Sequence, residues 1–467
     1  MQKTKLIRLL SSCSKRELDK FERYLTIHLE KSEDVKELFT FLKQFYNDWE
    51  NPALNNKNLQ LAFTQSQDAK SIGNLNSKLF LHLLDYLAYQ ELADKKNHVQ
   101  KEILIASIYE NRGLHDLKRR QLGRLQEFFT KKKLTAPWDI IHQLKVFELQ
   151  YYDEEDRIFD ATDLLVKTID KLNEFTNSLK IKYNSELLGR IQFLNLPHLQ
   201  SILDASLNTP VNHESFFQSI YYTLFQAFQT AEDFYFDETF VLLKKSHDRI
   251  DDSDRHHILL YLINYAARQS RKNKYIYSKT LFDLYKYGVD ENLLLENHSI
   301  SRVRFHNVVD VACKLKKITF ARNFVTNYKQ YLAEDTAKQT SYLASLLILF
   351  AEKNFDELQS QFVTTNFKFL DEKFRFKSLE ICCFYELNFQ EKLFLNKCKA
   401  FKNFLDRKKD KIGYDFISSY RNFTRIVEKL YDKTLPKSKI EQELESAKNI
   451  VLKYWLQEKL EDYRQEY

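Results

Sequence analysis

Two short stretches, KKITFARNF at residues 316–324 and EKNFDEL at residues 352–358, decide how this sequence folds. Each is a polar corner followed by a bulky residue and then by a small or apolar one, as where the second helix of a helical hairpin begins. Further breaks in the apolar pattern lie near Asp335, Asp371 and Asn388, so that successive breaks are 17 to 19 residues apart. Two helices therefore recur every 34 to 37 residues, a period typical of helical-repeat proteins.

Glycine and proline are scarce in this chain of 467 residues, which has Gly 6 and Pro 5. Together they make up about 2% of the chain, where average usage is roughly 12%. Tight turns between strands and phosphate-binding loops both need glycine, so the scarcity excludes sheet folds and Gly-rich nucleotide sites. Hydrophobic residues are 43% and aromatic residues 14% of the chain, which is too many for a disordered protein. The composition therefore predicts an all-α fold.

The few glycines and prolines also indicate where helices end. Gly123 and Gly189 lie inside apolar patterns of helical period and are predicted to be helical. The residues predicted to mark breaks between helices are Gly113, Pro137, Pro210, Gly288 and Pro436.

The charge balance and the cysteines indicate a cytoplasmic protein. Lys and Arg number 72 against 65 Asp and Glu, which gives a formal net charge of +7, too little alone to predict nucleic-acid binding. Five cysteines, an odd and sparse set, fit a reducing compartment better than a disulfide framework. The N-terminus has no apolar segment of signal length. The longest apolar run, at residues 342–351, is about half of the roughly 20 residues that a membrane span needs.

The chain is predicted to have three parts. Ser14 and Glu17 form an S-x-x-E capping box that begins a helix, and residues 75–92 are apolar on nearly every side, as in a central bundle helix. A closing helix is expected from Ser438 to Tyr463. The predicted parts are an N-terminal helical bundle at 1–95, a degenerate α-solenoid of helical hairpins at 96–436 and a C-terminal capping helix at 437–467.

Several short sequence segments resemble those of a known group of proteins. They are SKRELDKF at 14–21, LYLINY at 260–265, LFDLYK at 281–286, FHNVV at 305–309 and FKNFLDR at 401–407. With them the chain resembles uncharacterised bacterial all-helical proteins with degenerate tetratricopeptide-like repeats. The resemblance implies a solenoid of helical hairpins and assigns no catalytic residue.

Motifs for chemistry are absent from the sequence. It has no HExxH, CxxC, G-x-S-x-G, kinase or Walker signature. His256 and His257 are adjacent, so that on a helix they point about 100° apart and are poorly placed to chelate one ion together. The acidic runs 153–156 and 251–254 are interpreted as helix ends, with a cation site as the alternative. The sequence therefore predicts no catalytic, cofactor or metal residue, and no enzyme.

Basic residues form the candidate binding sites. On a helix, Arg120, Arg124 and Lys131 fall within roughly 40° of one another. A second cluster is Arg407, Lys408 and Lys409, and a third comprises Arg268, Arg271, Lys272 and Lys274 beside Tyr275 and Tyr277. Such clusters fit a solvated helical surface, a site for an acidic protein partner, or a nucleic-acid site in which aromatic rings stack on bases.

The expected function follows from the architecture. Stacked hairpins form a concave surface, so we expect a non-enzymatic scaffold or adaptor that binds a protein partner there. The alternatives are a nucleic-acid-binding or regulatory helical protein that uses the basic patches, and an enzyme of an unfamiliar helical class with a deep polar pocket. The many aromatic residues are expected in the core, or lining a groove that receives a peptide.

Overall fold

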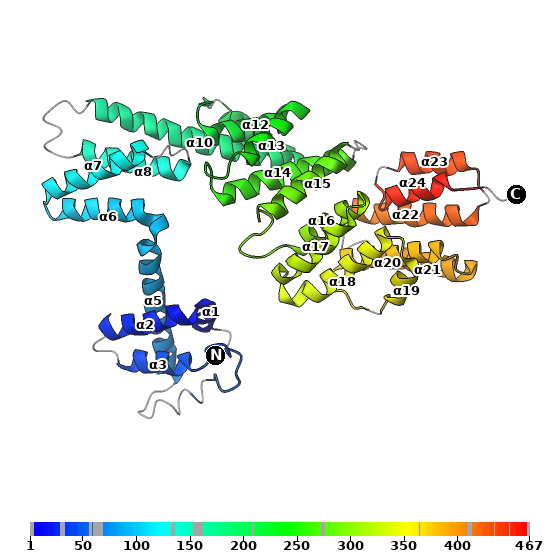
Figure 1. Cartoon of the computed structure of the whole chain (residues 1–467), viewed down its shortest axis with the longest axis horizontal. Helices are drawn as coiled ribbons and strands as arrows, with labels where there is room; N and C mark the ends of the chain where they lie inside the picture. The colour runs from blue at the N-terminus through cyan, green and yellow to red at the C-terminus, as the bar shows by residue number, and fades with distance from the viewer. Residues whose placement is uncertain are drawn as a thin grey trace. The chain divides into compact units, whose positions relative to one another are not determined.

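The fold was analysed in a computed structural model of the whole chain. It describes residues 4–28, 33–55, 58, 69–131, 136–152, 162–207, 210–271, 276–363, 365–408, 413–433, 435–447 and 449–464. These residues form 22 α-helices, are 80% helical and contain no strand, which confirms the predicted all-α class (Figure 1). The chain divides into two compact units, Met1–Leu179 and Lys180–Tyr467, and each is described by itself.

The first unit begins with four helices around one core. They are α1 (Lys5–Ser12), α2 (Lys15–His28), α3 (Glu33–Lys43) and α5 (Ala69–Ala93). The rings of Phe21 and Phe39 pack edge to face with centroids 5.0 Å apart, and Tyr86 of α5 lies 5.3 Å from Phe21. α5 packs against the three other helices, as its apolar sequence predicts for a central helix.

The capping box predicted at the start of α2 is present. The Ser14 amide donates to Glu17 Oε2 over 2.7 Å, and the Glu17 amide donates to Ser14 Oγ over 3.3 Å. The helix therefore begins with two of its free amide groups satisfied reciprocally. The hydrogen bonds from Ser14 hold the pKa of Glu17 below its ordinary value.

Three further helices of the first unit share a small core. They are α6 (His98–Asn111), α7 (His115–Lys131) and α8 (Pro137–Tyr151), and α10 (Thr162–Leu194) begins in this unit and ends in the next. Each of α6, α7 and α8 packs against the other two. The buried residues of their core are Ala106, Leu122, Leu125, Val146 and Leu149.

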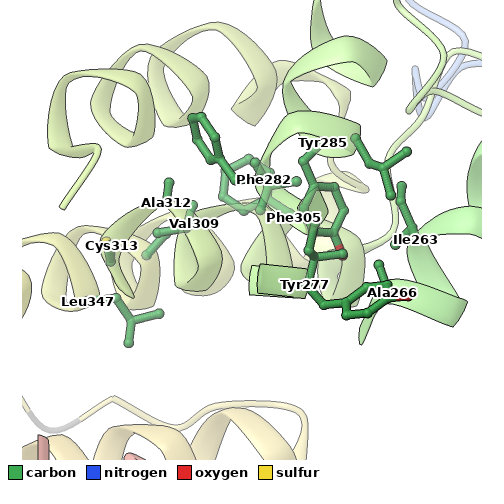
Figure 2. Packing of buried hydrophobic residues seen from close by; sticks show 14 of the residues in the cluster. Ile263, Ala266, Tyr277, Phe282, Tyr285, Phe305, Val309, Ala312, Cys313 and Leu347 are labelled. Carbon is green, nitrogen blue, oxygen red and sulfur yellow. The ribbon is translucent and has the colours of Figure 1, made fainter. Parts of the chain in front are cut away.

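The second unit is a longer series of helices. After α10 come α11 (Gln200–Ser206), α12 (Phe216–Thr230), α13 (Asp233–Lys244), α14 (Asp252–Arg271), α15 (Ile276–Asp290), α16 (Arg302–Lys314), α17 (Ile318–Tyr328), α18 (Glu334–Ala351), α19 (Phe355–Ser360), α20 (Leu370–Glu386), α21 (Glu391–Asp406), α22 (Tyr414–Asp432), α23 (Lys437–Ser446) and α24 (Lys453–Glu461). One continuous apolar core runs through them from Ile181 to Tyr463. Figure 2 shows part of this core, to which α14, α15, α16 and α18 all contribute.

The helices of the second unit pack in a regular order. Neighbours in sequence pack as pairs, and even-numbered helices also pack on one another: α12 on α14, α16 on α18, α18 on α20, α20 on α22 and α22 on α24. Side chains connect positions 36 residues apart: Ser185 donates to the Tyr221 carbonyl, Gln192 donates to the Phe228 carbonyl, and Arg255 pairs with Glu291. The first two contacts join α10 to α12, and the third joins α14 to the residue that follows α15.

The corners explain how the chain turns with so little glycine. Lys316, Lys353 and Asn388 have φ of 57°, 59° and 48°, the left-handed conformation that commonly ends a helix. Asn354 then caps α19, its side chain accepting from the Glu357 amide. The breaks predicted near residues 317, 354 and 388 are therefore confirmed, with Lys and Asn in positions that glycine often fills.

Two predicted features differ from the structure. Gly288 lies inside α15 instead of at a break. Its role is one of packing: Leu259 and Leu294 approach so closely that a side chain at this position would clash with them. The single closing helix expected from 438 to 463 is divided into α23 and α24. The chain leaves the helical path at Ala447, which is extended, and Leu452 is left-handed with φ 53°.

Candidate functional site

The first predicted basic cluster lies on α7. Arg120, Arg124 and Lys131 are all exposed on this helix. Arg124 Nη2 donates to Gln121 Oε1 over 2.7 Å, and Lys131 Nζ lies 4.0 Å from Glu127 Oε2. Two of the three cations therefore already have neighbours on their own helix.

The second predicted basic cluster follows α21. Arg407 is exposed and donates from Nε to the Asn403 carbonyl over 3.2 Å, while Lys408 is half-buried. Lys409 lies outside the described residues. This cluster and the α7 cluster belong to different units, so each is a separate candidate.

The third basic cluster is only partly described. Arg268 donates from Nη1 to the Gln192 carbonyl over 3.1 Å. Tyr277 is buried, and its hydroxyl donates to Asp233, so its ring belongs to the core. The side chain of Arg271 and residues 272–275 lie outside the described part of the chain, as does the acidic run at 153–156. In the other acidic run Asp251 caps α14 by accepting from the Asp254 amide over 2.7 Å, as predicted for a helix end.

Sequence reasoning missed a line of ionic contacts between α16 and α20. On α16, Arg302, His306 and Asp310 lie four residues apart and so share one face. Arg302 pairs with Asp371, and Asp310 pairs with Arg375. We call this set, with the central pair of His306 and Glu372, the ionic seam.

The centre of the ionic seam is fully buried. His306 Nε2 lies 3.1 Å from Glu372 Oε1, and the two side chains are 1% and 0% exposed. Thr340 of α18 donates to the same oxygen over 2.9 Å. Within the described structure, His306 Nδ1 and Glu372 Oε2 are buried without a hydrogen-bond partner. A carboxylate and an imidazole in an apolar core are costly unless paired, so this pair fixes how three even-numbered helices stack.

A similar cluster joins the earlier helices of the unit. Lys182 Nζ of α10 lies 2.6 Å from Asp254 Oδ1 of α14, and the Tyr221 hydroxyl of α12 donates to the same oxygen. Burial raises the pKa of the Tyr221 phenol well above its ordinary value, and the nearby Asp254 carboxylate adds to this. The Tyr221 hydroxyl therefore stays protonated and acts as a hydrogen-bond donor in this cluster at physiological pH.

The third polar cluster holds α24 in place. Glu386, at the end of α20, accepts from Trp455 Nε1 over 2.6 Å, and its Oε1 lies 2.8 Å from Lys459 Nζ. The Trp455 ring is 3% exposed and lies 5.4 Å from the ring of Tyr385. The residues that surround α24, which we call the α24-binding surface, are Phe350, Lys353, Tyr385, Glu386 and Phe423.

A cavity of about 580 Å³ lies in the first unit, between α6 and α8. Its lining is mainly apolar, and Trp138, 62% exposed, stands in it with Ile103 and Ile141. Lys145 and Glu148 of the lining pair with each other over 3.1 Å. Burial lowers the pKa of His142 in the same lining, so this imidazole is neutral at pH 7. The cavity can admit an apolar or aromatic group.

The cysteine thiols have low reactivity. All five are free and buried. Burial raises the pKa of Cys313, Cys383 and Cys398 to about 12 each. Since the thiolate is the reactive form, these side chains behave as small apolar residues.

Neither a metal site nor a membrane-spanning helix is present among the described residues. They contain no group of three His, Cys, Asp or Glu side chains placed to hold a metal ion. None of the described helices is long and apolar enough to cross a membrane.

Comparison with known proteins gives no match from which a role could be taken. No family model, no curated protein and no solved structure matches this chain.

Proposed function

We propose that this chain is a non-enzymatic, cytoplasmic scaffold that binds a protein partner on the concave face of a helical-repeat solenoid. The solenoid comprises the helices of the second unit, with the even-numbered helices lining the concave face. An acidic partner segment would meet the basic residues of the chain with complementary charge, which speeds encounter.

One observation carries the proposal: even-numbered helices pack on even-numbered helices through most of the second unit. The hydrogen bonds from Ser185 to the Tyr221 carbonyl and from Gln192 to the Phe228 carbonyl join even-numbered α10 and α12 and support the same order. Repeated hairpins stacked in this way turn by a small angle per repeat and form an extended binding surface. The free cysteines agree with a reducing compartment.

Photo-crosslinking in native lysate tests the proposal. Lys338 on even-numbered α18 and Lys399 on odd-numbered α21 are both exposed lysines, and each is replaced in turn by benzoylphenylalanine in the tagged full chain. We expect a stoichiometric protein that crosslinks from position 338 and not from position 399.

Three outcomes contradict the proposal. The first is no stoichiometric protein across several growth conditions, and the second is crosslinking from position 399 alone. The third is recovery of nucleic acid whose binding falls steeply with salt, which assigns the chain to the nucleic-acid alternative.

A further inference from the structure

The position of α24 is unusual for a helix that only closes a stack. A closing helix packs on its neighbours, and α24 does pack on α22 and α23. Its side chains also reach much earlier parts of the chain. The ring of Trp455 lies 6.3 Å from that of Phe350 on α18, and Glu458 pairs with Lys353, 105 residues away. α24 therefore crosses the C-terminal ends of α18 and α20 as well as covering α22.

α24 is anchored by one carboxylate, that of Glu386, which accepts hydrogen bonds from two of its side chains. Trp455 and Lys459 are four residues apart, so they project from the same face of α24, and both bind Glu386. The side chains of Lys459 and Glu386 are each only 13% exposed. Buried Trp side chains are among the few residues that dominate the energy of protein interfaces. The contact has the chemistry of a helix bound in a receptor site.

α24 is also too short to be helical on its own. It has 9 residues, fewer than the roughly 12 to 15 that an isolated helix needs in water, so its helical form depends on the surface beneath it. The described residues between α23 and α24 are not helical, and Leu452 among them is in the left-handed conformation, which is unfavourable for a non-glycine residue.

We propose that the α24-binding surface is an exchangeable site for a helix that presents Trp and Lys four residues apart, with α24 as its resident occupant. This inference rests on the proposed function and names its partner class. A partner helix enters as α24 leaves, with its Trp between the rings of Phe350, Tyr385 and Phe423 and its Lys on Glu386. The release of α24 then limits partner binding.

A peptide with the sequence of residues 449–464, labelled with fluorescein, tests the proposal by fluorescence anisotropy on the full-length chain. Trp455→Ala weakens the resident helix, so we expect this variant to bind the peptide at least tenfold more tightly than the natural chain does. Adding Glu386→Ala to that variant should abolish the gain. The matched control, Trp138→Ala, removes an exposed Trp elsewhere and should leave binding unchanged.

Several results overturn the inference. They are equal binding by the natural chain and the Trp455→Ala variant, a gain that survives Glu386→Ala, and a gain with Trp138→Ala. A concentration-dependent dimer of the natural chain that Trp455→Ala abolishes also overturns it, because α24 of a second copy is then the occupant.

If Trp455→Ala fails to fold, hydrogen exchange of the natural chain tests the release of α24 instead. Release of α24 predicts that its amides exchange at least tenfold faster than those of α22, and equal rates overturn the proposal. The inference and the proposed function fail separately. A partner crosslinked from position 338 without peptide binding leaves the proposed function standing, and peptide binding without a lysate partner leaves the inference standing.

Discussion

At the scale of single residues, the buried carboxylate of Glu372 has the largest predicted effect on stability. Glu372→Ala leaves His306 Nε2 and the Thr340 hydroxyl without their acceptor in the core. Removal of one partner of a buried pair costs about 3 to 5 kcal/mol, so we expect a loss of that size in the free energy of unfolding. Urea denaturation followed by circular dichroism measures it.

The conservative variant separates charge from hydrogen bonding at the same position. Glu372→Gln keeps an oxygen for Thr340 and His306, so its loss should be smaller. Glu441→Ala, on the exposed surface of α23, is the matched control and should change stability by less than about 0.5 kcal/mol. A Glu372→Ala chain as stable as the natural one would show that the ionic seam contributes nothing.

Glycine inside helices has opposite effects at two positions. A methyl group at Gly288 would lie 2.6 Å from Leu294 Cδ2 and 2.8 Å from Leu259 Cδ2, both on fully buried residues. Overpacking costs about 1 to 3 kcal/mol, and the helix gains roughly 1 kcal/mol from alanine. We expect Gly288→Ala to lower the free energy of unfolding by about 1 kcal/mol, measured by urea denaturation.

Gly123 is the control for this prediction. It lies in α7 with nothing within 4 Å of an added Cβ, so Gly123→Ala should keep the helix gain and stabilise its unit. A stabilising Gly288→Ala would mean that the leucines around it move aside freely.

At the scale of elements, the capping box of α2 predicts a pH dependence. Ser14→Ala removes the side-chain cap, at a cost of about 1 kcal/mol at pH 7. The pKa of Glu17 is lowered in the folded chain, so its contribution is complete above the ordinary carboxyl pKa and is lost as the pH falls through the lowered value. The cost of Ser14→Ala should therefore shrink near pH 3, in thermal unfolding at both pH values. If Ser14→Ala lowered stability equally at both pH values, the ionised form of Glu17 would have no part in the capping box.

Helix boundaries show how far pattern reading reaches at this scale. The breaks near 354 and 388 were predictable, because polar residues interrupt an apolar period there. The break at Leu452 was not predictable, since Leu is a good helix former and the apolar period continues past it. Packing of α24 against α18 and α20 requires the turn, and the energy of that packing outweighs the local preference.

At the scale of the whole molecule, the two units have separate cores. The buried cluster of the N-terminal helices, which runs from Leu6 to Tyr86, shares no residue with the core of the second unit. Leu38→Ala removes a side chain that is 1% exposed and should cost about 2 to 5 kcal/mol. We expect hydrogen exchange to accelerate in α1, α2, α3 and α5 and to stay unchanged in α16 to α22.

Ile27→Ala is the matched control for that measurement. Ile27 is 69% exposed on α2, so its truncation should leave exchange unchanged in both units. Faster exchange throughout the second unit in the Leu38→Ala chain would show that the units unfold as one.

The sequence by itself determined the all-α class and the corners near residues 317, 354 and 388, because apolar spacing, capping residues and scarce glycine act over a few neighbouring residues. Only the tertiary structure decided which polar residues meet. His306 and Glu372 are 66 residues apart, and Glu386 and Trp455 are 69 apart, so no local pattern connects them. Such pairs form where the stacking of helices brings distant side chains into one buried space. A charge that is buried there without a partner is strongly destabilising, so each is found next to a group that pairs with it.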